Sequence, residues 1–150
     1  MKQTFVLDQP PTLNKLIAAC RNNKYGAATI KKKWTNYSCR KAIADELVPF
    51  EGKVYLIATG QYKTTASDPD NIMVCLKYIL DGLVKADVIK DDTVKTVKNP
   101  ILFRVEPSPS IKVNGKKKRA EPVFKLEIFD NTEEFKLQCI HYLNQDTNDN

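Results

Sequence analysis

Apolar residues recur along the chain with two spacings, one typical of helices and the other of strands. The clearest helical spacing follows Asp68, where every third or fourth residue is apolar and predicts a helix that ends near residues 85–86. Weaker helical spacing predicts one helix from about residue 12, a second over residues 29–47 and a third over residues 132–144. Short runs rich in β-branched and aromatic residues predict strands at residues 4–7, 53–59, 93–97, 101–105 and 123–129.

Proline and aspartate residues mark where several of these elements end. The Pro10-Pro11 pair forces an extended exit from the first strand, and Pro49 is expected to end the helix over residues 29–47. Asp87 stands where a left-handed residue is expected after the central helix, a conformation that aspartate tolerates better than most residues.

A hairpin is predicted inside the long loop over residues 107–122. Asn114-Gly115 is a strong turn signal, and we expect the hairpin to present the four cations of residues 116–119 at its tip. After the last predicted helix, residues 145–150 are expected to form a polar, frayed tail.

Charge is distributed unevenly over the 150 residues. The formal net charge is +6, but residues 1–66 carry eleven Lys and Arg against four Asp and Glu, whereas residues 130–150 carry one against five. Basic residues are also concentrated over residues 99–129. This asymmetry favours a polyanionic partner such as nucleic acid, although a merely solvated surface would explain the same charges.

Composition excludes several other classes of protein. The four cysteines (Cys20, Cys39, Cys75 and Cys139) have no paired spacing, which predicts free thiols in a reducing compartment. No apolar run approaches 18 residues and no secretory segment is visible, so a soluble, cytoplasmic protein is expected. With His141 as its single histidine, the chain is a poor candidate for a Ser-His-Asp triad or a multi-histidine zinc site.

Carboxylates gather in two nearby segments, Asp68-Pro69-Asp70-Asn71 and Asp91-Asp92. Two carboxylates about 4 Å apart repel by roughly 4 kcal/mol at an effective dielectric of 20, so a cation is expected between them. Mg²⁺ suits such a site because it prefers oxygen ligands and binds through one or two carboxylates plus substrate phosphates. Ordinary roles remain open, since Asp68 also fits a helix N-cap and Asp91-Asp92 also fits a polar turn.

Three sequence blocks resemble the RusA-type Holliday-junction resolvases, which are small dimeric magnesium-dependent endodeoxyribonucleases common in phages and prophages. Residues 10–15 (Pro-Pro-Thr-Leu-Asn-Lys) are similar to the family's N-terminal proline-rich turn. Residues 68–71 are similar to its Asp-x-Asp-Asn motif, and residues 77–94 to its helix with the Asp-Asp end. The order and approximate spacing hold from about residue 4 to 129. The second and third blocks are specific, whereas the first is only supportive.

The resemblance and the predicted elements together imply a single-domain α+β fold, a small mixed β-sheet packed with two or three helices. Residues 1–130 would form the endonuclease domain, followed by a C-terminal helix and polar tail over residues 131–150. The resemblance implies metal-binding carboxylates at Asp68, Asp70 and Asp92, with Asp91 beside the last. It implies Mg²⁺ as cofactor, with Mn²⁺ as the alternative.

The resemblance also implies a catalytic lysine, and here the chain departs from the family. The family lysine stands four residues after the second aspartate, where this chain has Val74, and the nearest candidate is Lys77. Asp70 and Lys77 share a helix face but are separated by about 10.5 Å along the axis, instead of about 6 Å. A surface lysine without a catalytic role is therefore the alternative for Lys77.

The implied function is hydrolysis of phosphodiesters in branched DNA by a homodimer in a bacterial cell or a phage-infected host, without membrane contact. Two-fold symmetry would match the pseudo-two-fold symmetry of a four-way junction. A catalytically inactive, RusA-like basic DNA-binding protein is the competing hypothesis, and Val74 is its best argument. Phosphates are expected to bind Asn14, Lys15, Lys31, Lys32, Lys33, Arg40, Lys116, Lys117, Lys118 and Arg119.

Overall fold

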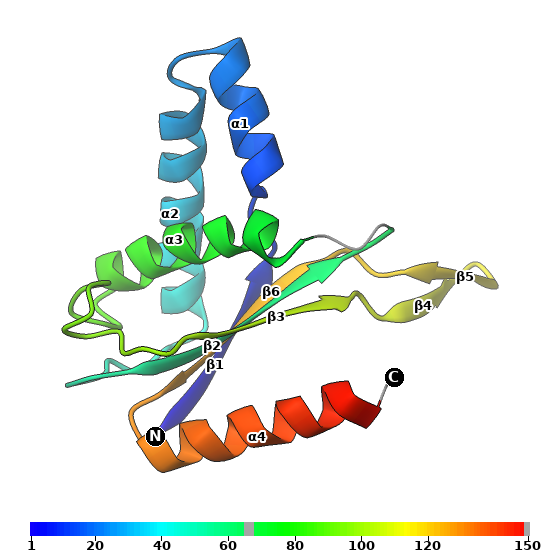
Figure 1. Ribbon diagram of the computed structural model, residues 1–150. Coiled ribbons are helices and arrows are strands. Elements are labelled where there is room, and N and C mark those ends of the chain that lie inside the picture. Colours follow the sequence, from blue (N-terminus) through cyan, green and yellow to red (C-terminus); the bar gives the residue numbers. More distant parts are fainter. Residues whose placement is uncertain (65–67, 149–150) are drawn as a thin grey trace.

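A computed structural model describes residues 1–64 and 68–148 of the chain, which form a single α+β domain (Figure 1). In chain order its elements are β1 (Lys2–Asp8), α1 (Leu13–Asn22), α2 (Gly26–Ala44), β2 (Tyr55–Tyr62), α3 (Pro69–Lys85), β3 (Leu102–Pro107), β4 (Ser110–Val113), β5 (Lys116–Arg119), β6 (Val123–Phe129) and α4 (Thr132–Asn148).

Four strands form a mixed sheet in the order β1-β6-β2-β3. Strand β6 is antiparallel to both β1 and β2, whereas β2 and β3 are parallel. Parallel neighbours require a long crossover connection, and α3 with the loop after it provides this crossover. The predicted α+β class with a small mixed sheet is confirmed.

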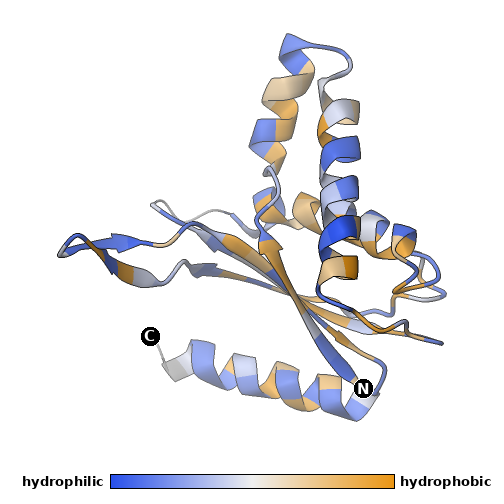
Figure 2. Cartoon of the chain, turned by 180° about the vertical axis from the view of Figure 1, so that it is seen from behind, coloured by the Kyte–Doolittle hydropathy of each residue, from blue (hydrophilic) through white to orange (hydrophobic). Residues whose placement is uncertain are grey.

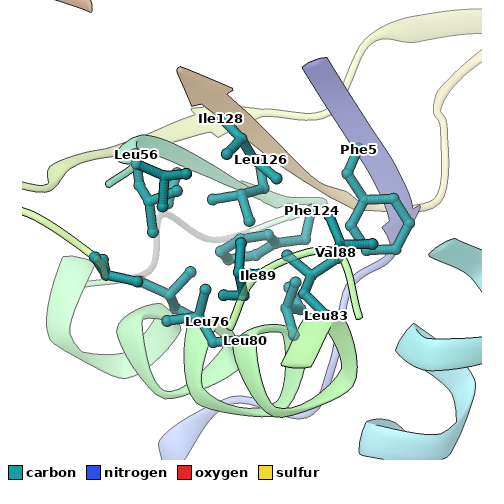
Figure 3. Packing of buried hydrophobic residues seen from close by; sticks show 14 of the residues in the cluster. Phe5, Leu56, Leu76, Leu80, Leu83, Val88, Ile89, Phe124, Leu126 and Ile128 are labelled. Carbon is teal, nitrogen blue, oxygen red and sulfur yellow. The ribbon is translucent and has the colours of Figure 1, made fainter. Parts of the chain in front are cut away.

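The main core lies between the sheet and α3 (Figure 3). Alternate residues of the strands, including Phe5, Leu56 and Leu126, point towards α3 because successive side chains of a strand face opposite sides. The apolar stripe predicted for the helix after Asp68 faces the sheet, with Ile72, Leu76, Ile79 and Leu83 all buried. Burying each such side chain contributes about 1.5–3 kcal/mol, so this stripe fixes α3 on the sheet.

Helix α4 covers part of the opposite face of the sheet (Figure 1), where Phe135 and Tyr142 pack on Ile57 and Phe129. Beneath it, Glu127 is almost fully buried and accepts a hydrogen bond of 2.5 Å from the Tyr142 hydroxyl. Two lysines complete this arrangement, which we call the Glu127 cluster (Lys2, Lys125, Glu127 and Tyr142). It ties the sheet to α4 through a buried carboxylate whose two lysine partners are each about a third exposed.

Helices α1 and α2 form a hairpin that projects away from the sheet, and much of its surface is hydrophilic (Figures 1 and 2). Residues 9–44 include eight Lys and Arg and no Asp or Glu. The hairpin therefore carries a strong positive charge that no acidic residue of its own offsets.

The hairpin predicted at Asn114-Gly115 is present as β4 and β5, and both turn residues have positive φ, of 51° and 75°. The expectation for its cations is wrong in one respect. Residues 116–119 form strand β5 itself and do not form the tip. Since side chains alternate along a strand, Lys116 and Lys118 face one side of the hairpin, and Lys117 and Arg119 face the other.

Other boundaries differ from prediction at three places. No strand forms over residues 93–97, where the described chain makes a hydrogen-bonded turn and Val97 alone bridges to Val54. Helix α2 ends at Ala44, before Pro49, because Glu46 takes a left-handed conformation with φ of 54°. Helix α4 continues through residues 145–148 of the predicted tail, and residues 149–150 lie outside the described residues.

Two further predictions agree with the structure. Asp87 has the expected left-handed conformation after α3, with φ of 57°, and all four cysteines are free thiols. Among the described residues, no helix combines the length and the apolar character that crossing a membrane requires.

Candidate active site

The first candidate carboxylates lie at the beginning of α3. Asp68 occupies the N-cap position and Pro69 the first helical position, as their residue types predict. The Asp68 side chain nevertheless makes no capping hydrogen bond, and only its backbone carbonyl accepts the N–H of Asn71, at 3.0 Å. Asp70 is exposed in the first turn, where its Oδ1 accepts the same N–H at 2.9 Å. Both carboxylates are therefore open to solvent at the positive end of a helix.

The N-terminal proline-rich block lies directly against this end of α3. The backbone N–H of Asn14 donates to Asn71 Oδ1 at 2.9 Å, and the Cys75 thiol donates to the carbonyl oxygen of Pro10 at 3.2 Å. Burial raises the pKa of Cys75 to about 12, so this group remains a neutral thiol and a hydrogen-bond donor. Two blocks that are more than fifty residues apart thus meet at one place.

About two turns along α3 from Asp70, the Lys77 amine binds two carboxylates. Its Nζ lies 2.8 Å from Asp81 Oδ1 and 2.5 Å from Asp92 Oδ2. The Lys77 side chain is 52% exposed and that of Asp92 is 28% exposed. Hydrogen bonds from the amine to Asp81 and Asp92 raise the pKa of Lys77, and the same bond to Lys77 lowers the pKa of Asp92. The amine and Asp92 therefore remain charged over the whole neutral range.

A second lysine reaches the other side of Asp81. Lys31 Nζ, from α2, lies 3.3 Å from Asp81 Oδ2, which is an ion pair without the alignment of a hydrogen bond. We call Lys31, Lys77, Asp81 and Asp92 the Lys77 cluster. It joins α2, α3 and the loop after α3 at the surface.

Asp91 has a local role. Its Oδ1 accepts the backbone N–H of Thr93 at 2.8 Å and the Thr93 hydroxyl at 2.6 Å. These bonds lower the pKa of Asp91 and form the turn that replaces the strand predicted over residues 93–97. Asp91 stands beside Asp92 in sequence, but it is bound to the turn and not to Lys77.

The structure therefore divides the predicted site into two parts. Lys77 and Asp92 are in contact, whereas no ion pair or hydrogen bond connects Asp68 or Asp70 to them among the described residues. Sequence reasoning assigned no role to Asp81, and it predicted a phosphate contact for Lys31 but not its ion pair with Asp81. The four-residue spacing between Lys77 and Asp81 indicated that these two side chains would pair. The pairing of Lys31 with Asp81 depends instead on how α2 packs against α3.

The predicted DNA contacts lie on three elements. Asn14 and Lys15 are on α1, Lys31 to Lys33 and Arg40 are on α2, and residues 116–119 form β5. Lys32 and Lys33 have no ion-pair partner within the described part of the chain. Arg119 differs from its neighbours, because its Nη1 donates to the carbonyl oxygen of Ser108 at 2.7 Å. This hydrogen bond holds the Arg119 side chain against the protein.

The donor chemistry of the site fits Mg²⁺, but not as a preformed cage. Within residues 1–64 and 68–148, no three carboxylate, cysteine or histidine side chains gather closely enough to hold a metal ion. Mg²⁺ commonly binds through one or two carboxylates and completes its shell with waters and substrate phosphates. Of the carboxylates that the resemblance assigns to the metal, Asp92 and Asp70 are both accessible to solvent, but no interaction within the described residues joins them.

No protein-family model and no curated protein matches this chain.

Proposed function

We propose that this protein is a metal-dependent endodeoxyribonuclease of the RusA type, which hydrolyses phosphodiesters at Holliday junctions or other branched DNA. The contact between Lys77 and Asp92 is the observation that carries the proposal. The resemblance assigns these residues separately, as the phosphate-binding amine and as a metal ligand. Their contact joins the middle of α3 to the loop after it at a partly exposed surface, and it brings the two groups together as a shared active site requires. The contact between Asn14 and Asn71 supports the proposal in the same way.

The residues of the Lys77 cluster and the neighbouring carboxylates have separate roles in this proposal. Lys77 is the catalytic residue. Its amine exchanges its contact with Asp92 for a contact with an oxygen of the scissile phosphate, while its ion pair with Asp81 keeps the amine in place. A fixed cation at that position stabilises the charge that develops in the transition state. Asp92 and Asp70, with Asp68 nearby in sequence, would hold Mg²⁺ or Mn²⁺, and Asp91 fixes the loop that carries Asp92. When bound, the divalent cation supplies Lewis-acid stabilisation of the phosphate and acidifies a water.

The basic α1–α2 hairpin and the β4–β5 hairpin bind the arms of the substrate through phosphates, which gives affinity that depends on salt and not on sequence. A homodimer supplies the two active sites that paired cuts at a junction require. The protein then acts in the cytoplasm of a bacterium or of a phage-infected host.

A second candidate function is DNA binding without catalysis. The observation in its favour is that the Lys77 amine is already occupied by two carboxylates, while the described residues gather no group of three metal ligands. In that case the Lys77 cluster would be a salt bridge network that only holds α2, α3 and the following loop together.

Cleavage assays decide between these functions. The purified protein is incubated with an end-labelled four-way junction, and separately with a linear duplex of matched sequence, each with and without Mg²⁺. We expect the junction alone to be cut, in paired positions and only with the metal ion. Junction binding without any cleavage in either Mg²⁺ or Mn²⁺ would favour the inactive DNA-binding protein.

Replacing the lysine tests its assignment within the same assay. Lys77→Ala is expected to lower the cleavage rate on the order of 100-fold, with little change in junction affinity, because the amine acts mainly in the transition state. Val74→Lys restores a lysine at the family position and is the matched control. If Lys77→Ala cuts normally and Val74→Lys cuts faster, Lys77 is a surface lysine and the assignment is wrong.

A further inference from the structure

A groove runs between α2 and α3, directly beside the candidate active site. It has a volume of about 460 Å³, and its polar lining consists of Lys31, Lys32, Thr35 and Asn36 from α2, and of Asp81 and Lys85 from α3. We call it the α2–α3 groove. Its volume falls within the range of roughly 300–1,000 Å³ that is usual for ligand sites.

The lining of the α2–α3 groove has an excess of positive charge. It includes three lysines and one carboxylate, and Lys77 already binds that carboxylate from outside the groove. Lys85 donates to Asn36 Oδ1 at 2.6 Å, and Lys32 has no ion-pair partner among the described residues. Neither of these two lysines is neutralised by an acid, so the groove attracts anions.

Other hollows of similar size do not share this excess. One of about 680 Å³ between β3 and α4 is lined by one cation, Arg104, and two carboxylates, Glu106 and Asp146. Two others, of about 410 Å³ and 350 Å³, also have at least as many acids as cations, with Lys15 beside Asp8 and Glu121 in one, and Lys2 beside Glu134 in the other. Among these four hollows, an excess of positive charge is therefore a property of the α2–α3 groove alone.

Gly82 brings the two walls of the groove together. A Cβ atom at this position would lie 2.4 Å from Ser38 Cβ and 2.9 Å from the backbone nitrogen of Cys39, so only glycine allows α2 and α3 to approach so closely. Asp81, the preceding residue, is the wall that the groove shares with the active site. One of its oxygens faces Lys77 and the other faces Lys31.

From this geometry we infer that the α2–α3 groove binds the phosphodiester backbone of the DNA strand next to the cleavage position. The inference rests on the proposed function. A strand whose phosphate contacts Lys77 meets the groove on the other side of Asp81, where Lys32 and Lys85 pair with its neighbouring phosphates. No aromatic side chain lines the groove, so it binds backbone and does not stack bases.

The test compares two double variants that carry the same charge. Lys32→Gln/Lys85→Gln alters the groove, and Lys53→Gln/Lys136→Gln removes two exposed lysines that do not line it, so each variant lowers the net charge from +6 to +4. Junction affinity is measured by fluorescence anisotropy over a range of NaCl concentrations without Mg²⁺, so that no cleavage occurs. Circular dichroism checks that both variants are folded.

We expect the log–log salt slope to flatten by about 1.8 for the groove variant, at roughly 0.9 per phosphate contact, and to remain that of the wild type for the control variant. Equal slopes in the two variants would overturn the inference while leaving the proposed nuclease function intact. Failure of the wild-type protein to bind any DNA would instead remove the proposed function itself.

A second measurement distinguishes DNA from free phosphate. The NMR signal of the Asn36 side-chain amide is followed during titration with a short single-stranded oligonucleotide and, separately, with inorganic phosphate at equal ionic strength. We expect a saturable shift with the oligonucleotide at concentrations where inorganic phosphate has no effect. Equal shifts from both would make the groove a site for a free anion and would also overturn the assignment to DNA.

Discussion

Two clusters in this molecule place a carboxylate between two lysines, but they differ in burial. In the Glu127 cluster, the carboxylate lies 2.7 Å from Lys2 Nζ and 3.4 Å from Lys125 Nζ, and its side chain is only 4% exposed. In the Lys77 cluster, Asp81 lies between Lys31 and Lys77, which are both more than half exposed. The same ionic chemistry therefore has two uses. Where water is excluded the charges hold elements together, and where water enters they remain free to exchange partners.

The pKa of Glu127 illustrates the buried case. Burial alone would raise this pKa, but the hydrogen bonds from Lys2 and Tyr142 and the charge of Lys125 outweigh it, so the pKa is lowered. The group stays ionised because its partners compensate for lost hydration. Asp92, by contrast, has one strong partner, Lys77, and still reaches solvent.

The largest expected effect is that of a substitution in the exposed Lys77 cluster on the rate of DNA cleavage. Asp92→Asn should lower the rate of junction cleavage on the order of 1,000-fold, because it removes the charge of the proposed metal ligand and the partner of Lys77. The free energy of unfolding should change by less than about 1 kcal/mol, as is usual for an exposed pair. Single-turnover cleavage and urea denaturation measure the two quantities, and normal cleavage by this variant in limiting Mg²⁺ would contradict the metal assignment.

A substitution in the buried Glu127 cluster should change the stability of the protein and not its cleavage rate. Glu127→Ala leaves the Tyr142 hydroxyl without its acceptor and Lys2 and Lys125 without their counterion, and we expect a loss of about 1–3 kcal/mol in the free energy of unfolding. Urea denaturation measures the loss. Cleavage below the melting transition should be unchanged, and a variant that is fully stable but inactive would show that the Glu127 cluster also serves the site.

The smallest expected effect concerns one pKa. The Lys77 hydrogen bond lowers the pKa of Asp92, so its contribution to stability is present above the unfolded value of about 4 and is lost as pH falls through the folded value. Lys77→Ala should raise the pKa of Asp92 towards its ordinary value. Carboxyl ¹³C NMR titration of Asp92 measures this shift, and an unchanged pKa would show that the contact between the two side chains does not persist in solution.

Local patterns predicted much of the fold. The apolar stripe of α3, the left-handed Asp87 and the turn at Asn114-Gly115 each depend on a few neighbouring residues, and all three are present as predicted. Residues 93–97 show why such patterns fail. Their alternation favours a strand, but hydrogen bonds from Thr93 to Asp91 close a turn before any partner strand is available.

The candidate site was predictable only in part. The residue types at Lys77 and Asp92 follow from the sequence blocks, but their contact depends on the path of the loop after α3. The partnership of Lys31 with Asp81 depends on the close packing of α2 and α3 at Gly82, which no helical periodicity reveals. Local patterns identify the chemical groups, whereas tertiary packing decides which of them share a partner.

The two clusters also differ in how much chain each must organise. The bond between Lys77 and Asp92 closes a segment of fifteen residues, whereas that between Lys2 and Glu127 joins residues 125 positions apart. The entropy lost on closing a loop grows with its length, so the shorter closure is the less costly and the faster to form. The contact between Lys77 and Asp92 therefore needs only α3 and its loop in place, whereas the ion pair between Lys2 and Glu127 also needs β1 to be paired with β6.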